Sequence, residues 1–170
     1  MSTLIASAER LTIYKSFQEQ VSGYKFKLYL LAKLPSAWFT GVKVVSLSNS
    51  SCKTSVPYKW LSQNPFKSTY FACQAMAAEL STGLPAIMAI QKRNPRVSML
   101  VVDMQAKFTK KAVGLTVFEC KDVEKIINTV EDAISSGEGK TVTIETIGLN
   151  KKGEEISTFT FTWSFKQKSK

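Results

Sequence analysis

Glu79 stands alone as an acidic residue in a basic stretch of the chain. Over the 83 residues from 20 to 102 it is the single Asp or Glu, beside ten Lys and Arg residues. It follows a run of small and apolar side chains, Ala72-Cys73-Gln74-Ala75-Met76-Ala77-Ala78, which predicts a helix buried on most faces. A carboxylate in such a place has a raised pKa and can act as a general base or nucleophile. The alternative is a structural glutamate that reaches solvent or pairs with Lys92 or Arg96, and the pattern favours neither interpretation.

Three further features near this helix could hold a ligand. The backbone N–H groups at its start, within residues 67–72, can stabilise an anion or a carbonyl oxygen, although every helix has such an end. Gln74 could bind a ligand, but such a glutamine more often satisfies a backbone group or lies at a subunit interface. The loop with Lys92, Arg93 and Arg96 could hold the phosphates of a nucleotide-bearing ligand, with a solvated loop as the commoner explanation.

The absence of histidine narrows the possible chemistry. With no His in 170 residues, Ser-His-Asp and Cys-His catalysis and His-ligated metal sites are excluded. Cys52, Cys73 and Cys120 form no CxxC pair, so we expect no metal site and free thiols in a reducing cytoplasm. The sequence contains no P-loop or GxGxxG motif and no apolar run of the ~18 residues that a membrane span needs. Its first residues lack the charged and apolar regions of a signal peptide, so we expect none.

The net charge of +10 favours anionic partners such as phosphorylated ligands, nucleic acid or anionic lipid. A solvated basic surface explains the same charge without a partner. The sequence has no run of five Lys or Arg and no RNA-recognition motif. We therefore expect no nucleic-acid partner, and keep nucleic-acid binding through the basic face only as a hypothesis without a motif.

The elements that must position these residues follow from the hydrophobic periodicity. The length fits one domain, with N-terminal helical segments over residues 1–41 and the main part over residues 42–170. The central helix is predicted from Ser68 to Thr82, ended by Gly83 and Pro85. The other predicted elements are helices 4–20, 24–34 and 121–135, a connector 36–41, and strands 42–47, 52–58, 97–108, 112–120, 141–149 and 156–165. One long helix beside mostly antiparallel strands is an α+β arrangement.

The segment from Asn64 to Gly83, NPFKSTYFACQAMAAELSTG, resembles the hotdog-fold superfamily. It is most similar to a branch related to phenylacetate-pathway and 4-hydroxybenzoyl-CoA thioesterases. In those enzymes a helix opens with His-Gly-Gly and carries an acidic residue seven positions after the second glycine. Here Tyr70-Phe71-Ala72 occupy the His-Gly-Gly positions, and Glu79 falls on the catalytic acid. Asn64 matches an asparagine often found in the preceding loop.

The resemblance implies an α+β hotdog fold, with an antiparallel sheet wrapped around a long central helix. At fold level it covers residues 42–165, adds an extra helix over 121–135, and implies pairing into homodimers or tetramers. It implies hydrolysis of an acyl-CoA thioester, with Glu79 as general base or nucleophile and the amides of Phe71 and Ala72 as oxyanion donors. CoA enters only as part of the substrate, and no other cofactor is expected. Substrate-binding positions would be Asn64, Tyr70, Gln74, Lys92, Arg93 and Arg96.

One departure from the family pattern opens an alternative. Tyr70-Phe71-Ala72 replaces the close-approach glycines, so side chains can crowd the acyl group even though the backbone N–H groups remain. The same groove would then hold an acyl or lipid-like ligand without turning it over. The sequence therefore predicts an acyl-CoA thioesterase, with a non-catalytic acyl-binding hotdog protein as the alternative.

Overall fold

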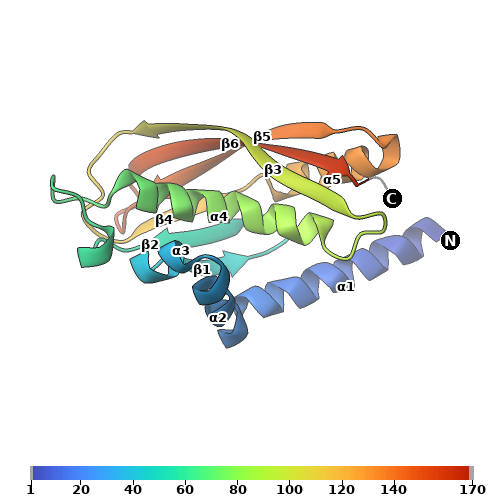
Figure 1. The fold of residues 1–170 in the computed structure, drawn as a ribbon, viewed down its shortest axis with the longest axis horizontal. Coiled ribbons are helices and arrows are strands. Elements are labelled where there is room, and N and C mark those ends of the chain that lie inside the picture. Colours follow the sequence, from blue (N-terminus) through green and yellow to red (C-terminus); the bar gives the residue numbers. More distant parts are fainter. Residues whose placement is uncertain (1, 169–170) are drawn as a thin grey trace.

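Helix α4 (Phe71–Ile90) lies along the inner face of a curved antiparallel sheet and is the element around which the chain is built (Figure 1). The computed structural model describes residues 2–168, and side chains from residue 8 to 168. The other helices are α1 (Ser2–Ser22), α2 (Tyr24–Lys33), α3 (Pro35–Thr40), α5 (Val123–Ser136) and the 3-10 turn η1 (Trp60–Ser62). The strands are β1 (Lys43–Leu47), β2 (Cys52–Val56), β3 (Val97–Phe108), β4 (Thr116–Cys120), β5 (Lys140–Leu149) and β6 (Glu155–Gln167).

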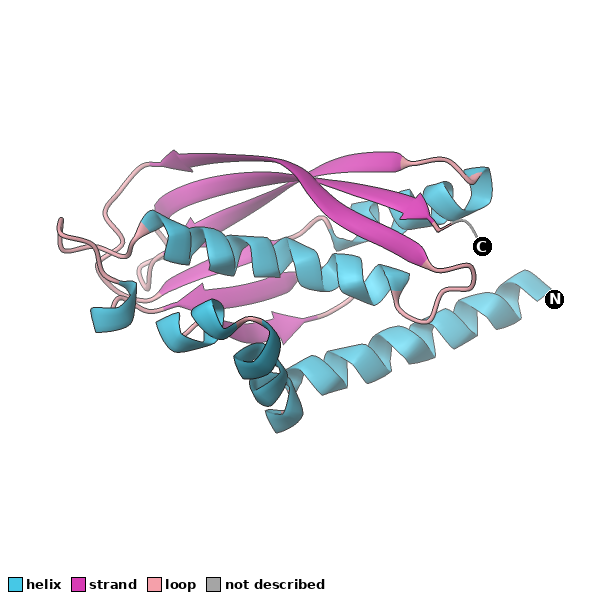
Figure 2. Ribbon diagram, in the orientation of Figure 1, coloured by secondary structure: helices cyan, strands magenta, loops and turns pink. Residues whose placement is uncertain are grey.

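The six strands form one sheet in the order β1-β2-β4-β5-β6-β3, with every neighbouring pair antiparallel. Strand β6 supplies the longest pairings, to β5 on one side and to β3 on the other. Strand β3 therefore lies at one edge of the sheet and β1 at the other. Figure 2 shows α4 cradled by this sheet, which is the hotdog arrangement that the resemblance implied.

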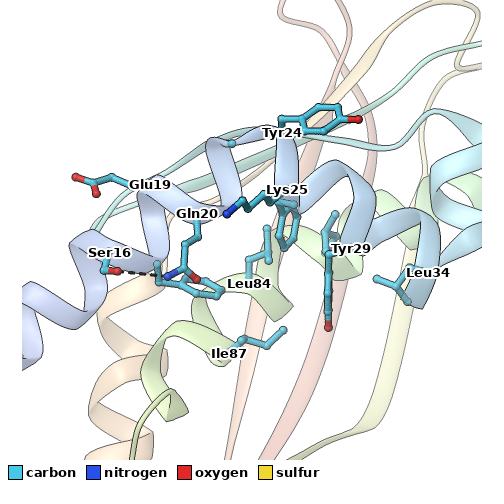
Figure 3. A pocket seen from close by; sticks show the side chains of 13 residues that line it. Ser16, Glu19, Gln20, Tyr24, Lys25, Tyr29, Leu34, Leu84 and Ile87 are labelled. Carbon is cyan, nitrogen blue, oxygen red and sulfur yellow. Dashed lines mark hydrogen bonds between the residues drawn. The ribbon is translucent and has the colours of Figure 1, made fainter.

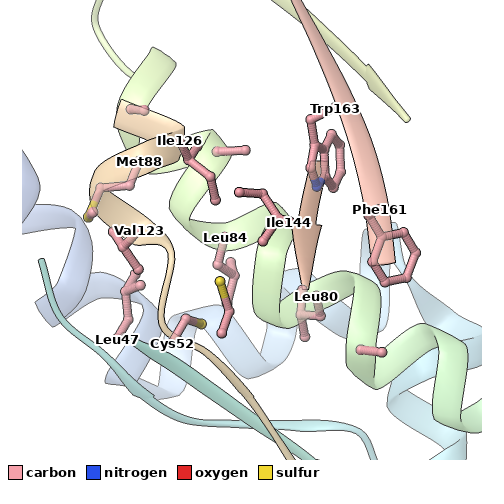
Figure 4. Packing of buried hydrophobic residues seen from close by; sticks show 14 of the residues in the cluster. Leu47, Cys52, Leu80, Leu84, Met88, Val123, Ile126, Ile144, Phe161 and Trp163 are labelled. Atoms are coloured by element: carbon pink, nitrogen blue, oxygen red, sulfur yellow. The ribbon is translucent and has the colours of Figure 1, made fainter. Parts of the chain in front are cut away.

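The core forms where the sheet faces α4. On β6, aromatic residues alternate with threonine and serine, so that Phe159, Phe161, Trp163 and Phe165 are buried while their neighbours face outward. From α4, Leu84 and Met88 meet this layer, and α5 buries Val123 and Ile126 beside them, among other residues (Figure 4). The late helix and strands match the sequence prediction, because their periods of 3.6 and 2 residues are unambiguous.

The predicted end of the central helix is wrong. The helix runs to Ile90, through both Gly83 and Pro85, instead of stopping at Thr82. A proline inside a helix costs about 3 kcal/mol, but the turns that follow bury Leu84, Ala86, Met88 and Ala89 almost completely. Burying several apolar side chains, at about 1.5–3 kcal/mol for each large one, outweighs that cost.

Two shorter predictions also change in the structure. Residues 36–41, predicted as a connector, form most of α3, which starts with Pro35 in its first turn and ends at Gly41 with φ 83°. The strand predicted from residue 112 begins only at Thr116, since residues 109–115 form the loop that leads into it. Neither change alters the order of the larger elements.

The N-terminal helices pack on the side of α4 that the sheet leaves open. On α1, Tyr14, Phe17 and Val21 are buried, and Arg10 donates hydrogen bonds to the carbonyl oxygens of Ala89 (2.9 Å) and Gln91 (2.8 Å). Helix α2 follows α1 after the single residue Gly23 and buries only Leu30. Among the described helices, none combines the length and apolar character required to cross a membrane.

Candidate functional site

Glu79 lies in the first half of α4, half-buried beside Gly83 and the ring of Trp163. A Cβ placed on Gly83 would lie 3.1 Å from Glu79 Oε1 and 3.4 Å from two ring atoms of Trp163. The glycine one turn later therefore provides the space that the carboxylate occupies. Burial raises the pKa of Glu79 above its usual value.

Within the described part of the chain, the Glu79 carboxylate has no ion-pair partner. The alternative pairing with Lys92 or Arg96 does not form, because both lie beyond the C-terminal end of α4. The carboxylate instead borders a small cavity of about 220 Å³, which Lys33, Leu34, Met76 and Leu80 also line. An accessible, desolvated carboxylate without a partner is the arrangement expected of a general base.

The helix turn that carries Glu79 is tied to the sheet. Trp163 Nε1 donates a hydrogen bond to Thr82 Oγ1 (3.0 Å), and Thr82 Oγ1 in turn donates to the carbonyl oxygen of Glu79 (3.0 Å). The indole is thereby held beside Gly83. Sequence reasoning could not predict this contact, because Trp163 and Thr82 are 81 residues apart.

The start of α4 presents two free amides. The N–H groups of Cys73 and Gln74 donate to the carbonyl oxygen of Tyr70, whereas those of Phe71 and Ala72 have no acceptor among the described residues. These are the first two positions of the helix, where amide donors and the helix dipole both favour an oxyanion. The rings of Tyr70 and Phe71, 44% and 53% exposed, stand beside them.

A cavity of about 580 Å³ opens at this end of α4. The predicted positions Asn64, Tyr70, Phe71 and Gln74 all line it, together with Phe66, Phe108, Lys110 and Lys111. The structure therefore brings four of the predicted residues to one place. The lysines were not predicted, because only the fold returns the loop after β3 to the start of α4, where Thr69 N donates to the Ala112 carbonyl oxygen (2.8 Å).

Two of these predicted residues are already engaged within the chain. Gln74 Nε2 donates to the Thr69 carbonyl oxygen (3.1 Å), and its Oε1 accepts a hydrogen bond from Ser157 Oγ (2.9 Å). Asn64 Oδ1 accepts from the amides of Phe66 (3.0 Å) and Ser68 (3.2 Å). Both side chains therefore hold the walls of the cavity in place.

Lys92, Arg93 and Arg96 lie at the opposite end of α4. Twenty helical residues span about 30 Å, so one chain does not bring these cations to the Phe71 end. Arg93 donates to Glu131 (3.0 Å) and to the Ala89 carbonyl oxygen (3.0 Å), which fixes it structurally. Lys92 and Arg96 are exposed.

The cysteines take no part in this site. Cys52 and Cys120 face each other on β2 and β4, and all three thiols are free and buried. Burial raises the pKa of each thiol, that of Cys120 to about 11, which leaves them poor nucleophiles. No cluster of three His, Cys, Asp or Glu residues in the described chain has a geometry that could hold a metal ion.

The long helix, the antiparallel sheet and the site on that helix define a protein of the hotdog class. The chain belongs to the DUF4442 family, described as a domain of unknown function, which matches residues 24–165. The relation to phenylacetate-pathway and 4-hydroxybenzoyl-CoA thioesterases stays a prediction. No curated protein matches the chain at a significant level.

Solved structures share this fold at low sequence identity. A Pseudomonas aeruginosa protein of unknown function, described as a probable thioesterase, is 18% identical with a TM-score of 0.72, over 86% of this chain and 97% of that one. A Chlorobaculum tepidum protein of unknown function is 17% identical with a TM-score of 0.73, over 89% and 97%. A Haemophilus influenzae thioesterase is 10% identical with a TM-score of 0.60, over 82% and 88%. Likeness at these identities establishes the fold.

Proposed function

We propose that this protein hydrolyses acyl-CoA thioesters, with Glu79 as the general base. The observation that supports this most is the unpaired Glu79 carboxylate, which borders a cavity on the central helix and has a raised pKa. The fold it shares with proteins described as thioesterases supports the same class of reaction. The buried thiols fit a reducing compartment, so we propose a cytoplasmic location.

The reaction needs a base, a water molecule and an oxyanion site. Glu79 takes a proton from water as the water oxygen bonds to the thioester carbon, and the carbonyl oxygen becomes an oxyanion. The free amides of Phe71 and Ala72 donate hydrogen bonds to that oxyanion. The oxyanion then re-forms the carbonyl as the C–S bond breaks, and the leaving sulfur takes the proton that Glu79 held, which gives the carboxylic acid and free CoA thiol and restores the Glu79 carboxylate. Base catalysis of this kind contributes about 10²–10⁴-fold.

One protomer cannot apply both groups to the same thioester. Phe71 and Glu79 are eight residues apart, which is about 12 Å along a helix axis. The oxyanion donor and the base must both lie within about 3 Å of groups on one reacting carbon. We therefore propose that each site combines Glu79 of one chain with the Phe71 and Ala72 amides of a second copy.

Edge strand β3 is the surface on which we propose that the copies pair. Phe108 pairs with Ser157, whose hydroxyl bonds Gln74 of α4, so Phe108 faces the helix side of the sheet. Phe108 and Met104 nevertheless remain 48% and 46% exposed. An unpaired edge with uncovered apolar residues on its inner face favours pairing with another strand.

Two lysines in the loop after β3 lie beside the start of α4 and are cations that CoA phosphates could contact. Lys110 and Lys111 line the same cavity as Phe71, and Lys111 Nζ lies 3.4 Å from the Phe66 carbonyl oxygen. We propose these two as phosphate contacts for the thioester bound at that cavity. Lys92 and Arg96 were predicted for this role. We keep the proposal that they contact the phosphates of a CoA that extends to the C-terminal end of α4.

Thiol release from a panel of acyl-CoAs tests the function directly. We expect release by the wild type and a loss of about 10²-fold or more in Glu79→Gln. The matched control is Glu124→Gln, an exposed glutamate on α5, which should hydrolyse like the wild type. Full hydrolysis by Glu79→Gln would exclude the proposed base.

The second candidate function is acyl binding without turnover. The observation that favours it is the bulk at the oxyanion end, where Tyr70 and Phe71 stand half-exposed beside the free amides. A thioester carbonyl must approach those amides closely. A ligand that co-purifies with the protein, combined with no thiol release from any acyl-CoA, would favour this function over hydrolysis.

A further inference from the structure

A cavity larger than those beside Glu79 and at the start of α4 lies between the α1–α2 hairpin and α4. It measures about 910 Å³ and is lined by residues near the end of α1, by much of α2, and by Leu80, Leu84 and Ile87 of α4. Figure 3 shows Leu84 and Ile87 pointing from α4 toward Tyr29 and Leu34 on the opposite side. Its size falls within the range of small-molecule sites.

The walls of this cavity are apolar and incompletely packed. Phe26 and Tyr29 stack with their ring centroids 5.5 Å apart, and they face the leucines of α4. Tyr29 and Ile87 are 50% and 36% exposed although they line the cavity. Side chains that face open space lose dispersion contacts, so an apolar occupant would supply contacts that the chain itself does not.

The cavity shares two lining residues with the small cavity beside Glu79. Leu34 and Leu80 line both this cavity and the small one that Glu79 borders. Leu80 follows Glu79 directly on α4, so the side chains of Leu34 and Leu80 stand between the two spaces. A ligand with its reacting carbon near Glu79 would reach the larger cavity by displacing the side chains of Leu34 and Leu80.

The charges around the cavity argue against a phosphorylated occupant. Its lining contains one cation, Lys25, and one anion, Glu19. The polar atoms of Gln20 and Ser16 bond to each other, with Gln20 Nε2 donating to Ser16 Oγ (3.3 Å). No cluster of donors lines this space, whereas the lysines that suit CoA lie at the start of α4.

We propose that the cavity between the α1–α2 hairpin and α4 binds the hydrocarbon chain of a medium- or long-chain fatty acyl ligand. The placement of the reacting carbon beside Glu79 rests on the proposed function. The binding of the hydrocarbon chain in the cavity does not depend on that function. The chain enters past Leu34 and Leu80 and packs between Tyr29 and Ile87. The N-terminal hairpin is thus a substrate-recognition element.

Titration with free fatty acids tests chain binding in the cavity and requires no turnover. The probes are octanoate, dodecanoate and hexadecanoate below their micelle concentrations, titrated calorimetrically into the wild-type protein. Each buried methylene should tighten binding by about fourfold until the cavity is filled. Equal affinity for the three acids, or no binding of any of them, would overturn the inference.

Variants that fill the cavity locate the chain. Ile87→Trp and, independently, Tyr29→Trp should weaken hexadecanoate binding by about tenfold or more and affect octanoate less. Leu11→Trp is the matched control, since Leu11 is 56% exposed on α1 and does not line the cavity. Unchanged hexadecanoate affinity in both filling variants, with folding verified by circular dichroism, would place the chain elsewhere.

The outcome separates this inference from the proposed hydrolysis. One outcome is that fatty-acid binding depends on chain length and is weakened by Ile87→Trp, but no thiol is released from acyl-CoA. That outcome would support the chain-binding inference and exclude the proposed hydrolysis. If Ile87→Trp leaves hydrolysis unchanged for every chain length, the proposed hydrolysis is supported and chain binding in this cavity is excluded.

Discussion

At the scale of single residues, Glu79 is a partly buried carboxylate whose neighbours come from other parts of the fold. A lone carboxylate in a small-residue helix signals costly burial, and the structure places it half-buried with a raised pKa. Its neighbours Trp163 and Thr82 come from a distant strand and a later helical turn. Neither these neighbours nor Lys110 and Lys111 could be predicted as site residues, because local sequence does not show which loop returns to which end of a helix.

Glu79 should make stability depend on pH in a definite direction. Burial raises its pKa in the folded state, so the folded protein holds this proton more tightly than the unfolded chain. The stabilisation is fully present below the unfolded pKa and is lost as the pH rises through the folded pKa. Glu79→Gln cannot ionise, so its melting temperature relative to the wild type should increase over that pH range.

Melting curves of both proteins across the acidic to neutral range provide the measurement. Glu124→Gln, on the exposed surface of α5, should follow the wild type at every pH. If the difference between Glu79→Gln and the wild type stays constant with pH, then Glu79 does not titrate differently in the two states.

At the scale of elements, periodicity predicted the strands and helices well, whereas their ends depended on tertiary contacts. The aromatic alternation on β6 and the helical repeat on α5 are local patterns that the structure keeps. Gly83 and Pro85 are local stop signals that it overrides, since the turns beyond them are buried. At Gly83 the missing Cβ leaves room for the end of the Glu79 side chain, which is a three-dimensional reason that no local rule contains.

Gly83→Ala should therefore separate helix stability from activity. Alanine favours a helix interior over glycine by about 1 kcal/mol, and the new Cβ would meet the flexible end of Glu79 at 3.1 Å. Because the carboxylate can move aside, we expect unchanged or higher stability together with slower hydrolysis. Urea unfolding and thiol release measure the two effects.

The double variant shows whether the loss acts through Glu79. Gly83→Ala combined with Glu79→Gln should hydrolyse no more slowly than Glu79→Gln alone, because the displaced carboxylate is already absent. An additive loss would mean that Gly83 serves the reaction by another route, such as the position of Trp163.

At the scale of the whole molecule, α4 borders three spaces, and in the proposed assembly one ligand would use the start of one copy's α4 together with the Glu79 and hairpin cavities of the other copy. Its start carries the free amides and the lysine-lined cavity, its first half carries Glu79, and its second half lines the cavity under the N-terminal hairpin. The sequence resemblance predicted homodimers or tetramers. The separation between Phe71 and Glu79 along one helix gives that prediction a physical reason.

A proline at position 71 removes one oxyanion donor without interrupting α4. Phe71 is the first helical residue, where proline is favoured because its N–H has no helical acceptor. Tyr70 has φ −59° and ψ 137°, a conformation that a following proline accepts. Phe71→Pro should therefore fold like the wild type and lose hydrolysis, as Glu79→Gln does.

Mixing these two inactive variants tests whether a site spans two copies. After dissociation and reassociation, half of the dimers should be mixed, and each would combine the intact Glu79 of the Phe71→Pro chain with the intact amides of the Glu79→Gln chain. One of its two sites is then complete, so we expect about a quarter of the wild-type activity. Each variant treated alone is the control. Mixtures that stay as inactive as their components would place both groups in the same chain or remove one of them from the mechanism, since no pairing of copies would then complete a site.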